Sequence, residues 1–153
     1  MEARWNGQAY SYRNDPAVPA FADDRAIVIF DGKCVMCSGF AQLILRRDTH
    51  FQFRLLAAQS PLGAALYRHY GLDPADYETN ILIERGLPKI KSEASIRILT
   101  QLGFPWSMAR LGWLLPWMIR DRLYDFVARN RFNWFGVRES CYVPQPGDDA
   151  RFL

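Results

Sequence analysis

The sequence predicts an α/β protein with a mixed β-sheet and a helical C-terminal extension. Three observations support this fold class: short apolar runs rich in β-branched residues, an apolar stripe at helical spacing directly after the first run, and a later pair of runs joined by a glycine turn. At 153 residues the chain suits one domain, which we place at 25–153, with the helical extension from about 105. Residues 1–24 are expected to form a flexible arm, because glycine, proline and asparagine break any period there.

The first strand is expected at 26–30, where a continuous apolar run predicts burial on both faces of a sheet. A helix should follow, since four residues share one apolar face: Cys37, Phe40, Ala41 and Ile44. Alternation over 51–55 predicts the second strand, in parallel with the first. Ser60-Pro61 then begins a second helix that ends at Gly71.

A hairpin and a third helix complete the predicted core. Residues 80–84 form a strand, 85–87 a turn, and 88–91 an edge strand that begins with a proline. Ser92 is expected to cap the third helix, whose buried face should hold Ser95, Ile98, Leu99 and Leu102. The order is therefore β-α-β-α-β-β-α, which is similar to that of thioredoxin.

The sequence predicts a C-terminal extension that is helical and rich in aromatic residues. Ser107 is expected to cap a short helix that Pro116 interrupts. The next helix should bury one apolar face, made of Ile119, Leu123, Phe126, Val127 and Asn130. Six arginines and two aspartates lie within 110–138. We favour helices packed on the sheet with a charged outer face over a surface that meets a membrane or a partner protein.

Composition excludes several classes of protein. A chain that is 50% hydrophobic and 14% aromatic is not largely disordered. A net charge of +3 is too small to argue for nucleic-acid binding, so we expect no nucleic-acid partner. The longest apolar run, 111–119, falls short of the roughly 20 residues of a membrane span. No signal peptide is visible, and we expect a cytoplasmic protein whose three cysteines form no structural disulfide framework.

The chemically informative motif is a Cys-x-x-Cys pair, Cys34 and Cys37, directly after the first predicted strand and at the start of a helix. A helix N-terminus stabilises a thiolate, which is the attacking species in thiol chemistry. Because Cys37 lies on the apolar stripe, we expect Cys37 to face the core and Cys34 to face solvent. Cys34 is then the nucleophile and Cys37 the resolving thiol of a disulfide exchange.

Two charged neighbours have alternative interpretations. Asp31 could accept the proton of Cys37, or could simply make the Asp-Gly turn, and the two readings are evenly balanced. Lys33 could stabilise a Cys34 thiolate by its charge, although a solvated lysine is favoured.

The remaining cysteine and the two histidines carry weaker expectations. A closed zinc site needs four ligands, often supplied as two closely spaced pairs. The other candidate ligands are Cys141, His50 and His69, and none of them forms a second such pair. We therefore expect neither a metal nor a cofactor. Cys141 is read as a small core residue rather than a third redox thiol. Neither histidine has a matching serine or acid, so a nucleophilic triad is not expected.

The chain resembles the DCC family of thiol-disulfide oxidoreductases, which is named for an Asp-x-x-Cys-x-x-Cys motif matched by Asp31, Cys34 and Cys37. The resemblance covers about residues 26–146. Besides the motif and the hairpin, the matching segments are 53–60, 92–95, 124–132, 134–136 and 141–144.

This resemblance implies a thioredoxin-like fold and an oxidoreductase that acts on a protein disulfide or a small thiol, with a separate reductant. Thioredoxin-like enzymes place a cis-proline before the third strand, facing the cysteines. Residues 76–80 hold no proline and the nearest is Pro74, so Glu78 or Thr79 would take its place. The alternative function is a non-catalytic module, in which the cysteines hold a metal or act as a redox switch and the Arg/aromatic tail binds a partner or membrane.

Overall fold

The computed structural model describes residues 9–72, 81–136 and 151–152. A four-stranded mixed sheet lies at its centre, in the order β2-β1-β3-β4. β1 (Ala26–Phe30) pairs in parallel with β2 (Phe53–Ala57) and antiparallel with β3 (Ile81–Glu84), which forms a hairpin with β4 (Leu87–Ile90). This arrangement confirms the predicted mixed sheet, and it places the strand with Pro88 at an edge.

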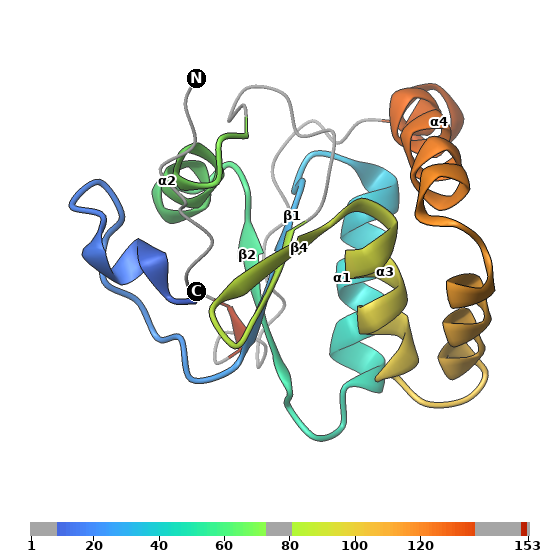
Figure 1. Cartoon of the computed structure of the whole chain (residues 1–153), viewed down its shortest axis with the longest axis horizontal. Coiled ribbons are helices and arrows are strands. Elements are labelled where there is room, and N and C mark those ends of the chain that lie inside the picture. Colours follow the sequence, from blue (N-terminus) through green and yellow to red (C-terminus); the bar gives the residue numbers. More distant parts are fainter. Residues whose placement is uncertain (1–8, 73–80, 137–150, 153) are drawn as a thin grey trace.

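Helices cover both faces of the sheet (Figure 1). α1 (Val35–Arg47) and α3 (Lys91–Thr100) lie on one face, and α2 (Pro61–His69) lies on the other. Alternate residues of β1 serve the two layers: Val28 and Phe30 join the core under α1 and α3, whereas Ile27 and Ile29 join the core under α2. The continuous apolar run at 26–30 is thus explained by burial on both sides. The order β-α-β-α-β-β-α is confirmed, as is a thioredoxin-like α/β architecture.

β2 begins two residues later than predicted. Phe51 has a left-handed backbone with φ of 52°, which an extended strand does not allow. The carboxylate of Asp48 accepts the backbone N–H groups of Gln52 and Phe53, each at 2.9 Å. Because these groups bond a side chain, the strand ladder starts only at Phe53.

The hairpin turn is shorter than predicted, and Ser92 is not a helix cap. Arg85 and Gly86 both have positive φ, as a two-residue hairpin turn requires, so Leu87 already belongs to β4. Ser92 lies inside α3, whose N-cap is Ile90 without a side-chain bond. The Ser92 hydroxyl instead donates a hydrogen bond to Asp121.

The buried stripe of α3 also differs in part from the prediction. Ile98 and Leu102 are buried as expected, together with Ala94. Ser95 and Leu99 are half-buried and line a cavity. Since Ala94, Ile98 and Leu102 are four residues apart, they form one narrow buried line that runs along α3 and into the turn after it.

The C-terminal extension forms an outer layer. A 3₁₀ helix, η2 (Trp106–Leu114), leads through Pro116 into α4 (Trp117–Phe135), which contacts α3 and α1 (Figure 1). The expected Ser107 cap is absent from η2, which begins one residue earlier after Pro105 and has no side-chain capping bond. Pro116 separates the two helices as predicted.

The predicted buried face of α4 is wrong for Ile119, Leu123 and Phe126, whereas Val127 and Asn130 are half-buried. Ile119, Leu123 and Phe126 are 47%, 56% and 57% exposed, while the half-buried side includes Arg120, Asp121, Tyr124, Val127 and Ala128. The outer face carries the exposed arginines Arg122 and Arg129, but it is largely apolar rather than charged as expected. Exposed apolar side chains of η2 and α4 include Met108, Leu111, Leu114, Trp117, Met118, Ile119, Phe126 and Trp134.

Part of the segment predicted as a loose arm packs against the domain. Tyr12 and Val18 are buried in the core under α2, and the backbone N–H of Tyr10 bonds the carbonyl of Gly86 at 3.0 Å. Hydrogen bonds from Arg13 and Tyr12 hold the pKa of Asp23 below its ordinary value.

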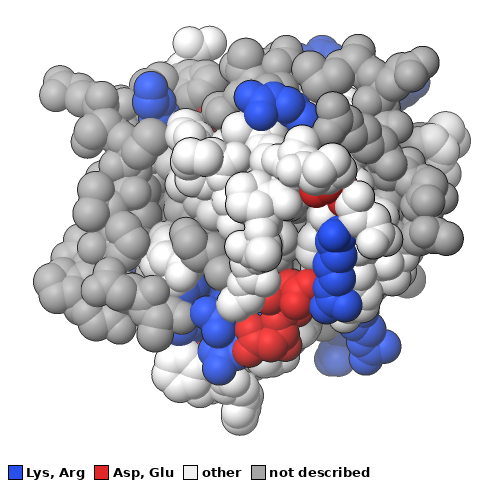
Figure 2. Space-filling model, turned by 90° about the vertical axis from the view of Figure 1, so that its left-hand side faces the viewer, with Lys and Arg blue, Asp and Glu red and all other residues white. Residues whose placement is uncertain are grey.

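On this side of the molecule, acidic and basic side chains lie close together (Figure 2). This face therefore carries both charges rather than a patch of one sign.

Candidate functional site

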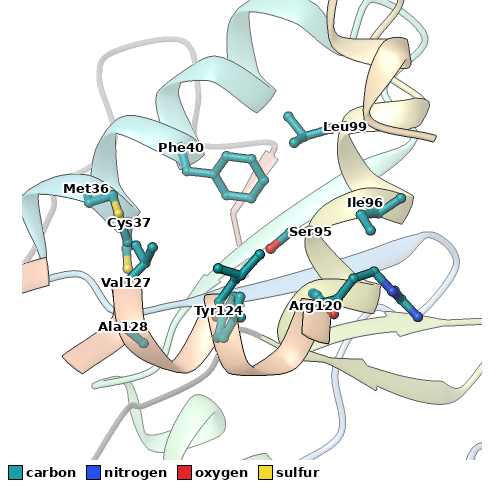
Figure 3. Close-up of a pocket in the computed structure, with 12 residues that line it drawn as sticks. Met36, Cys37, Phe40, Ser95, Ile96, Leu99, Arg120, Tyr124, Val127 and Ala128 are labelled. Atoms are coloured by element: carbon teal, nitrogen blue, oxygen red, sulfur yellow. The ribbon is translucent and has the colours of Figure 1, made fainter. Parts of the chain in front are cut away.

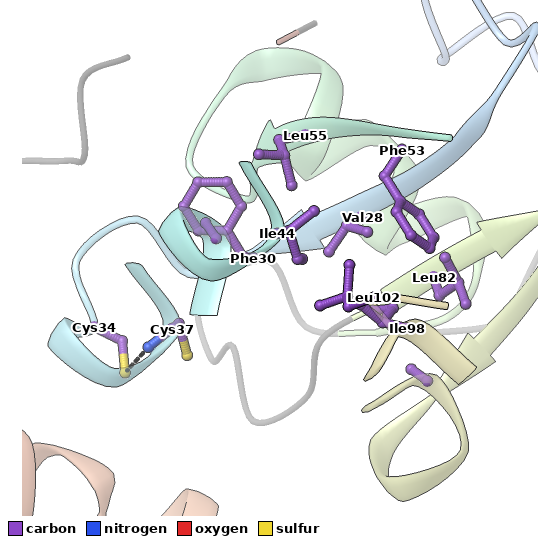
Figure 4. Packing of buried hydrophobic residues seen from close by; sticks show 12 residues of the cluster. Val28, Phe30, Cys34, Cys37, Ile44, Phe53, Leu55, Leu82, Ile98 and Leu102 are labelled. Carbon is purple, nitrogen blue, oxygen red and sulfur yellow. Dashed lines mark hydrogen bonds between the residues drawn. The ribbon is translucent and has the colours of Figure 1, made fainter. Parts of the chain in front are cut away.

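The two cysteines of the motif lie where the sequence places them, between β1 and α1. Cys34 is the N-cap residue of α1, with an extended backbone. Its Sγ accepts the backbone N–H of Cys37 at 3.3 Å (Figure 4). A sulfur that accepts a hydrogen bond at the positive end of a helix is stabilised as a thiolate. The two sulfurs are not joined by a disulfide in this structure.

Cys37 faces the core as expected, but the expectation that Cys34 faces solvent is wrong. Cys34 is fully buried at 0% exposure, and Cys37 is 5% exposed. The Sγ atom of Cys34 lies at the first turn of α1, where it accepts the N–H of Cys37. Cys37 instead lines a cavity between the helices. The thiol nearer to a potential ligand is therefore Cys37.

Asp31 holds the loop that leads to Cys34. Its carboxylate oxygen Oδ1 accepts the N–H of Lys33 at 3.0 Å, and its carbonyl accepts the N–H of Cys34 at 3.2 Å. Asp31 is 3% exposed, whereas Lys33 is exposed. The turn-forming role of Asp31 is thus present in the structure, and its carboxylate is buried beside the cysteine motif.

Gln59 is a residue of this site that the sequence reasoning missed. Its amide nitrogen donates to Asp31 Oδ1, and its amide oxygen accepts the N–H of Gly32 at 2.9 Å. Gln59 follows β2, and β2 runs parallel to β1, so the carboxyl ends of both strands meet at one edge. The position of Gln59 just after the second parallel strand was the available signal.

A cavity of about 390 Å³ adjoins Cys37 between α1, α3 and α4 (Figure 3). Its walls are mostly apolar and include Met36, Phe40, Leu99 and Val127. Arg120 supplies a charged group to its lining. The sequence reasoning did not find this cavity, because it arises only when α4 turns its Tyr124–Ala128 side inward.

His69 has a serine and an acid as hydrogen-bond partners, which the sequence did not predict. Its Nε2 lies 2.7 Å from Ser11 Oγ, and its Nδ1 lies 2.8 Å from Asp15 Oδ2. All three residues are buried. Ser11 and Asp15 lie 58 and 54 residues away in sequence, so no local pattern could show the arrangement. The network ties the segment around η1 (Ser11–Asn14) to α2.

Several sequence expectations concern residues outside the described ranges. These are Cys141 and the candidate replacements for the cis-proline, Glu78 and Thr79, together with Pro74. His50 is exposed in the loop before β2. Within the described ranges, no three His, Cys, Asp or Glu side chains gather as metal ligands would.

Comparison with known proteins gives the class to which this fold and site belong. The DCC1-like thiol-disulfide oxidoreductase family matches residues 28–137. The chain belongs to this family, and the resemblance noted from the cysteine motif is confirmed.

Two relatives extend the match. The uncharacterised protein YuxK of Bacillus subtilis strain 168 is 35% identical over 83% of this chain and 93% of its own length. A chloroplastic DCC family protein of Arabidopsis thaliana is 35% identical over 78% of this chain and 70% of its own length. No solved structure matches the chain. Over the described parts of the chain, no helix has both the length and the apolar character of a membrane span.

Proposed function

We propose that this protein is a thiol-disulfide oxidoreductase that works through Cys34 and Cys37. The observation that carries the proposal is the bond from the Cys37 N–H to Cys34 Sγ at 3.3 Å, at the N-terminus of α1. It favours a thiolate at Cys34 over one at Cys37, and it supports Cys34 as the nucleophile. The family description agrees with a redox activity of this kind.

The reaction balances without a cofactor. The Cys34 thiolate attacks one sulfur of a substrate disulfide, and the other substrate sulfur leaves as a thiolate and takes a proton. Cys37 then loses its proton and attacks Cys34 Sγ, which forms the Cys34–Cys37 disulfide and releases the second substrate thiol. A separate dithiol reductant must reopen this disulfide. The substrate is a protein disulfide or a small disulfide.

Titration of the Cys34–Cys37 couple tests the proposal. In a Cys141→Ser background, the protein is equilibrated with buffers of reduced and oxidised dithiothreitol, and remaining thiols are alkylated and counted by mass. We expect one two-electron transition, in which the oxidised-to-reduced ratio changes tenfold for about every 30 mV. A Cys34→Ser protein serves as the control without a couple. If no intramolecular disulfide forms even in fully oxidising buffer, the proposal fails.

Asp31 is proposed to accept the proton of Cys37 during the second step. Its carboxylate is buried and held beside the motif by Lys33 and Gln59. Asp31→Asn keeps an acceptor for the Lys33 N–H and removes the base. We expect the mixed disulfide to decay about 100-fold more slowly at pH 7, since general base catalysis contributes at least that much.

The pH dependence separates this role from a structural one. A cysteine thiol ionises by itself near pH 8.5, so the deficit of the Asp31→Asn protein should shrink as the pH rises above that value. Quench-flow followed by mass spectrometry measures the lifetime of the mixed disulfide. A deficit that stays the same from pH 6 to pH 10 would assign Asp31 to the turn alone.

A further inference from the structure

The cavity between α1, α3 and α4 has the size and lining of a ligand site. Its volume of about 390 Å³ lies within the range of roughly 300–1,000 Å³ that small-molecule sites occupy. Met36, Phe40, Leu99 and Val127 make its walls predominantly apolar. Such walls suit an aliphatic or aromatic body and not a sugar or a nucleotide phosphate.

The cavity has two chemically different ends (Figure 3). Met36 and Cys37 lie together at one end, and Arg120 lies beside Ile96 at the other. A ligand that fills the cavity therefore meets a thiol at one end and a guanidinium group at the other. This polarity fits an elongated ligand with one anionic terminus.

The guanidinium group of Arg120 is held in place by two contacts, and one of its N–H donors, Nη1, is not used by them. Its Nε donates to the carbonyl of Leu115 at 3.2 Å, and its Cζ lies over the ring of Trp113, 4.7 Å from the ring centroid. Its Nη1 is buried and has no hydrogen-bond partner among the described residues. A buried donor on a charged group is costly unless it bonds an acceptor, and a carboxylate is the best matched one.

Two carboxylates of α3 and α4 accept hydrogen bonds from groups other than Arg120. Asp121, the next residue in α4, accepts a hydrogen bond from the Ser92 hydroxyl, and Ser92 itself lines the cavity. Glu93 lies on α3 and bonds Arg97 Nε at 3.2 Å. Arg120 lines the cavity, and its Nη1 is the group left to bond a ligand there.

We propose that this cavity binds an aliphatic carboxylate, with the carboxylate on Arg120 and the hydrocarbon chain along the apolar walls toward Cys37. The cavity adjoins Cys37 of the proposed redox pair, but ligand binding does not require the disulfide exchange and can be tested with the pair reduced. A bound chain covers Cys37, because that residue lines the far end of the cavity.

Decanoate serves as the probe and decanol as its uncharged counterpart, each below the concentration at which it self-associates. Isothermal titration of the reduced full chain should show saturable binding of one decanoate per chain. The rate at which iodoacetamide alkylates Cys37, resolved by peptide mass, should fall as decanoate saturates the protein.

Two variants and one matched control locate the ligand. Arg120→Met should weaken decanoate binding about tenfold or more and leave decanol binding unchanged, since only the charged hydrogen bond is lost. Ala128→Phe fills the cavity with a ring and should abolish binding of both ligands. Arg129→Met is the control, because Arg129 is an exposed arginine of the same helix that does not line the cavity.

Several results would overturn the proposal. One is the absence of saturable decanoate binding to the wild-type protein. Others are equal loss of affinity in the Arg120→Met and Arg129→Met proteins, and unchanged binding in the Ala128→Phe protein with its thermal unfolding intact. An unaltered rate of Cys37 alkylation in the decanoate-saturated protein would show that the hydrocarbon chain of decanoate does not reach Cys37. None of these results bears on the redox couple, which is measured without the probe.

Discussion

A Cys37→Ser protein is expected to accumulate mixed disulfides through Cys34, and a Cys34→Ser protein is expected to form none. The helix N-terminus stabilises a Cys34 thiolate in both the wild-type and the Cys37→Ser protein, so the first attack proceeds. Without Cys37 the adduct has no resolving thiol and persists. Turnover of disulfide should fall about 100-fold or more in each variant, as when one member of a catalytic unit is removed.

Non-reducing mass spectrometry of each protein, after incubation with oxidised glutathione, measures the adducts. Cys141→Ser is the background and also the control for incidental thiols. The burial of Cys34 makes this experiment decisive for the roles of the pair. If adducts form only in the Cys34→Ser protein, the nucleophile is Cys37, the thiol that lines the cavity, and the roles proposed above are reversed.

Asp48→Asn should be among the most destabilising substitutions of the chain. The side chain of Asp48 is 0% exposed, and its Oδ2 accepts a hydrogen bond from Arg151 Nη2 at 2.6 Å. Neutralising one partner leaves the other charge buried and uncompensated. We expect the free energy of unfolding to fall by about 3–5 kcal/mol in urea titrations.

Asp24→Asn is the matched control for this substitution. Asp24 also pairs with arginine, Arg54 at 3.2 Å, but its side chain is 59% exposed. Its loss should cost less than about 1 kcal/mol, because solvent screens exposed pairs. A double variant, Asp48→Asn with Arg151→Met, should recover part of the lost stability. Equal losses in the two single asparagine variants would mean that the buried pair contributes no more than a surface pair.

The core elements were predictable because their signals are local. The β-branched run of β1, the Ser60-Pro61 start of α2 and the Arg85-Gly86 turn each act within a few residues. The placement of the Cys-x-x-Cys pair at the start of α1 follows from the same local signals. The family match to residues 28–137 then supports the redox reading of that pair.

What the sequence could not show depends on contacts between distant residues or on a choice between similar faces. α4 carries apolar side chains around much of its circumference, so periodicity alone did not decide between the Phe126 side and the Tyr124–Ala128 side. The side that faces α1 and α3 is the one that completes a cavity with Arg120. The direction of Cys34 Sγ depends on a side-chain rotamer at the N-cap, and sequence spacing carries no information about rotamers. The Ser11–His69–Asp15 network joins residues more than 50 positions apart.

The Asp48–Arg151 pair also constrains the order of events while the ribosome makes the chain. The two residues are 103 positions apart, and Phe152 forms a parallel bridge with Leu55 beside the same edge of β2. Domains fold from the N-terminus as synthesis proceeds, so β1, α1 and β2 emerge long before Arg151 does. Until then Asp48 has no cationic partner from that segment, and burying it is unfavourable. The corner between α1 and β2 should therefore stay open in the nascent chain and close only after Arg151 leaves the exit tunnel.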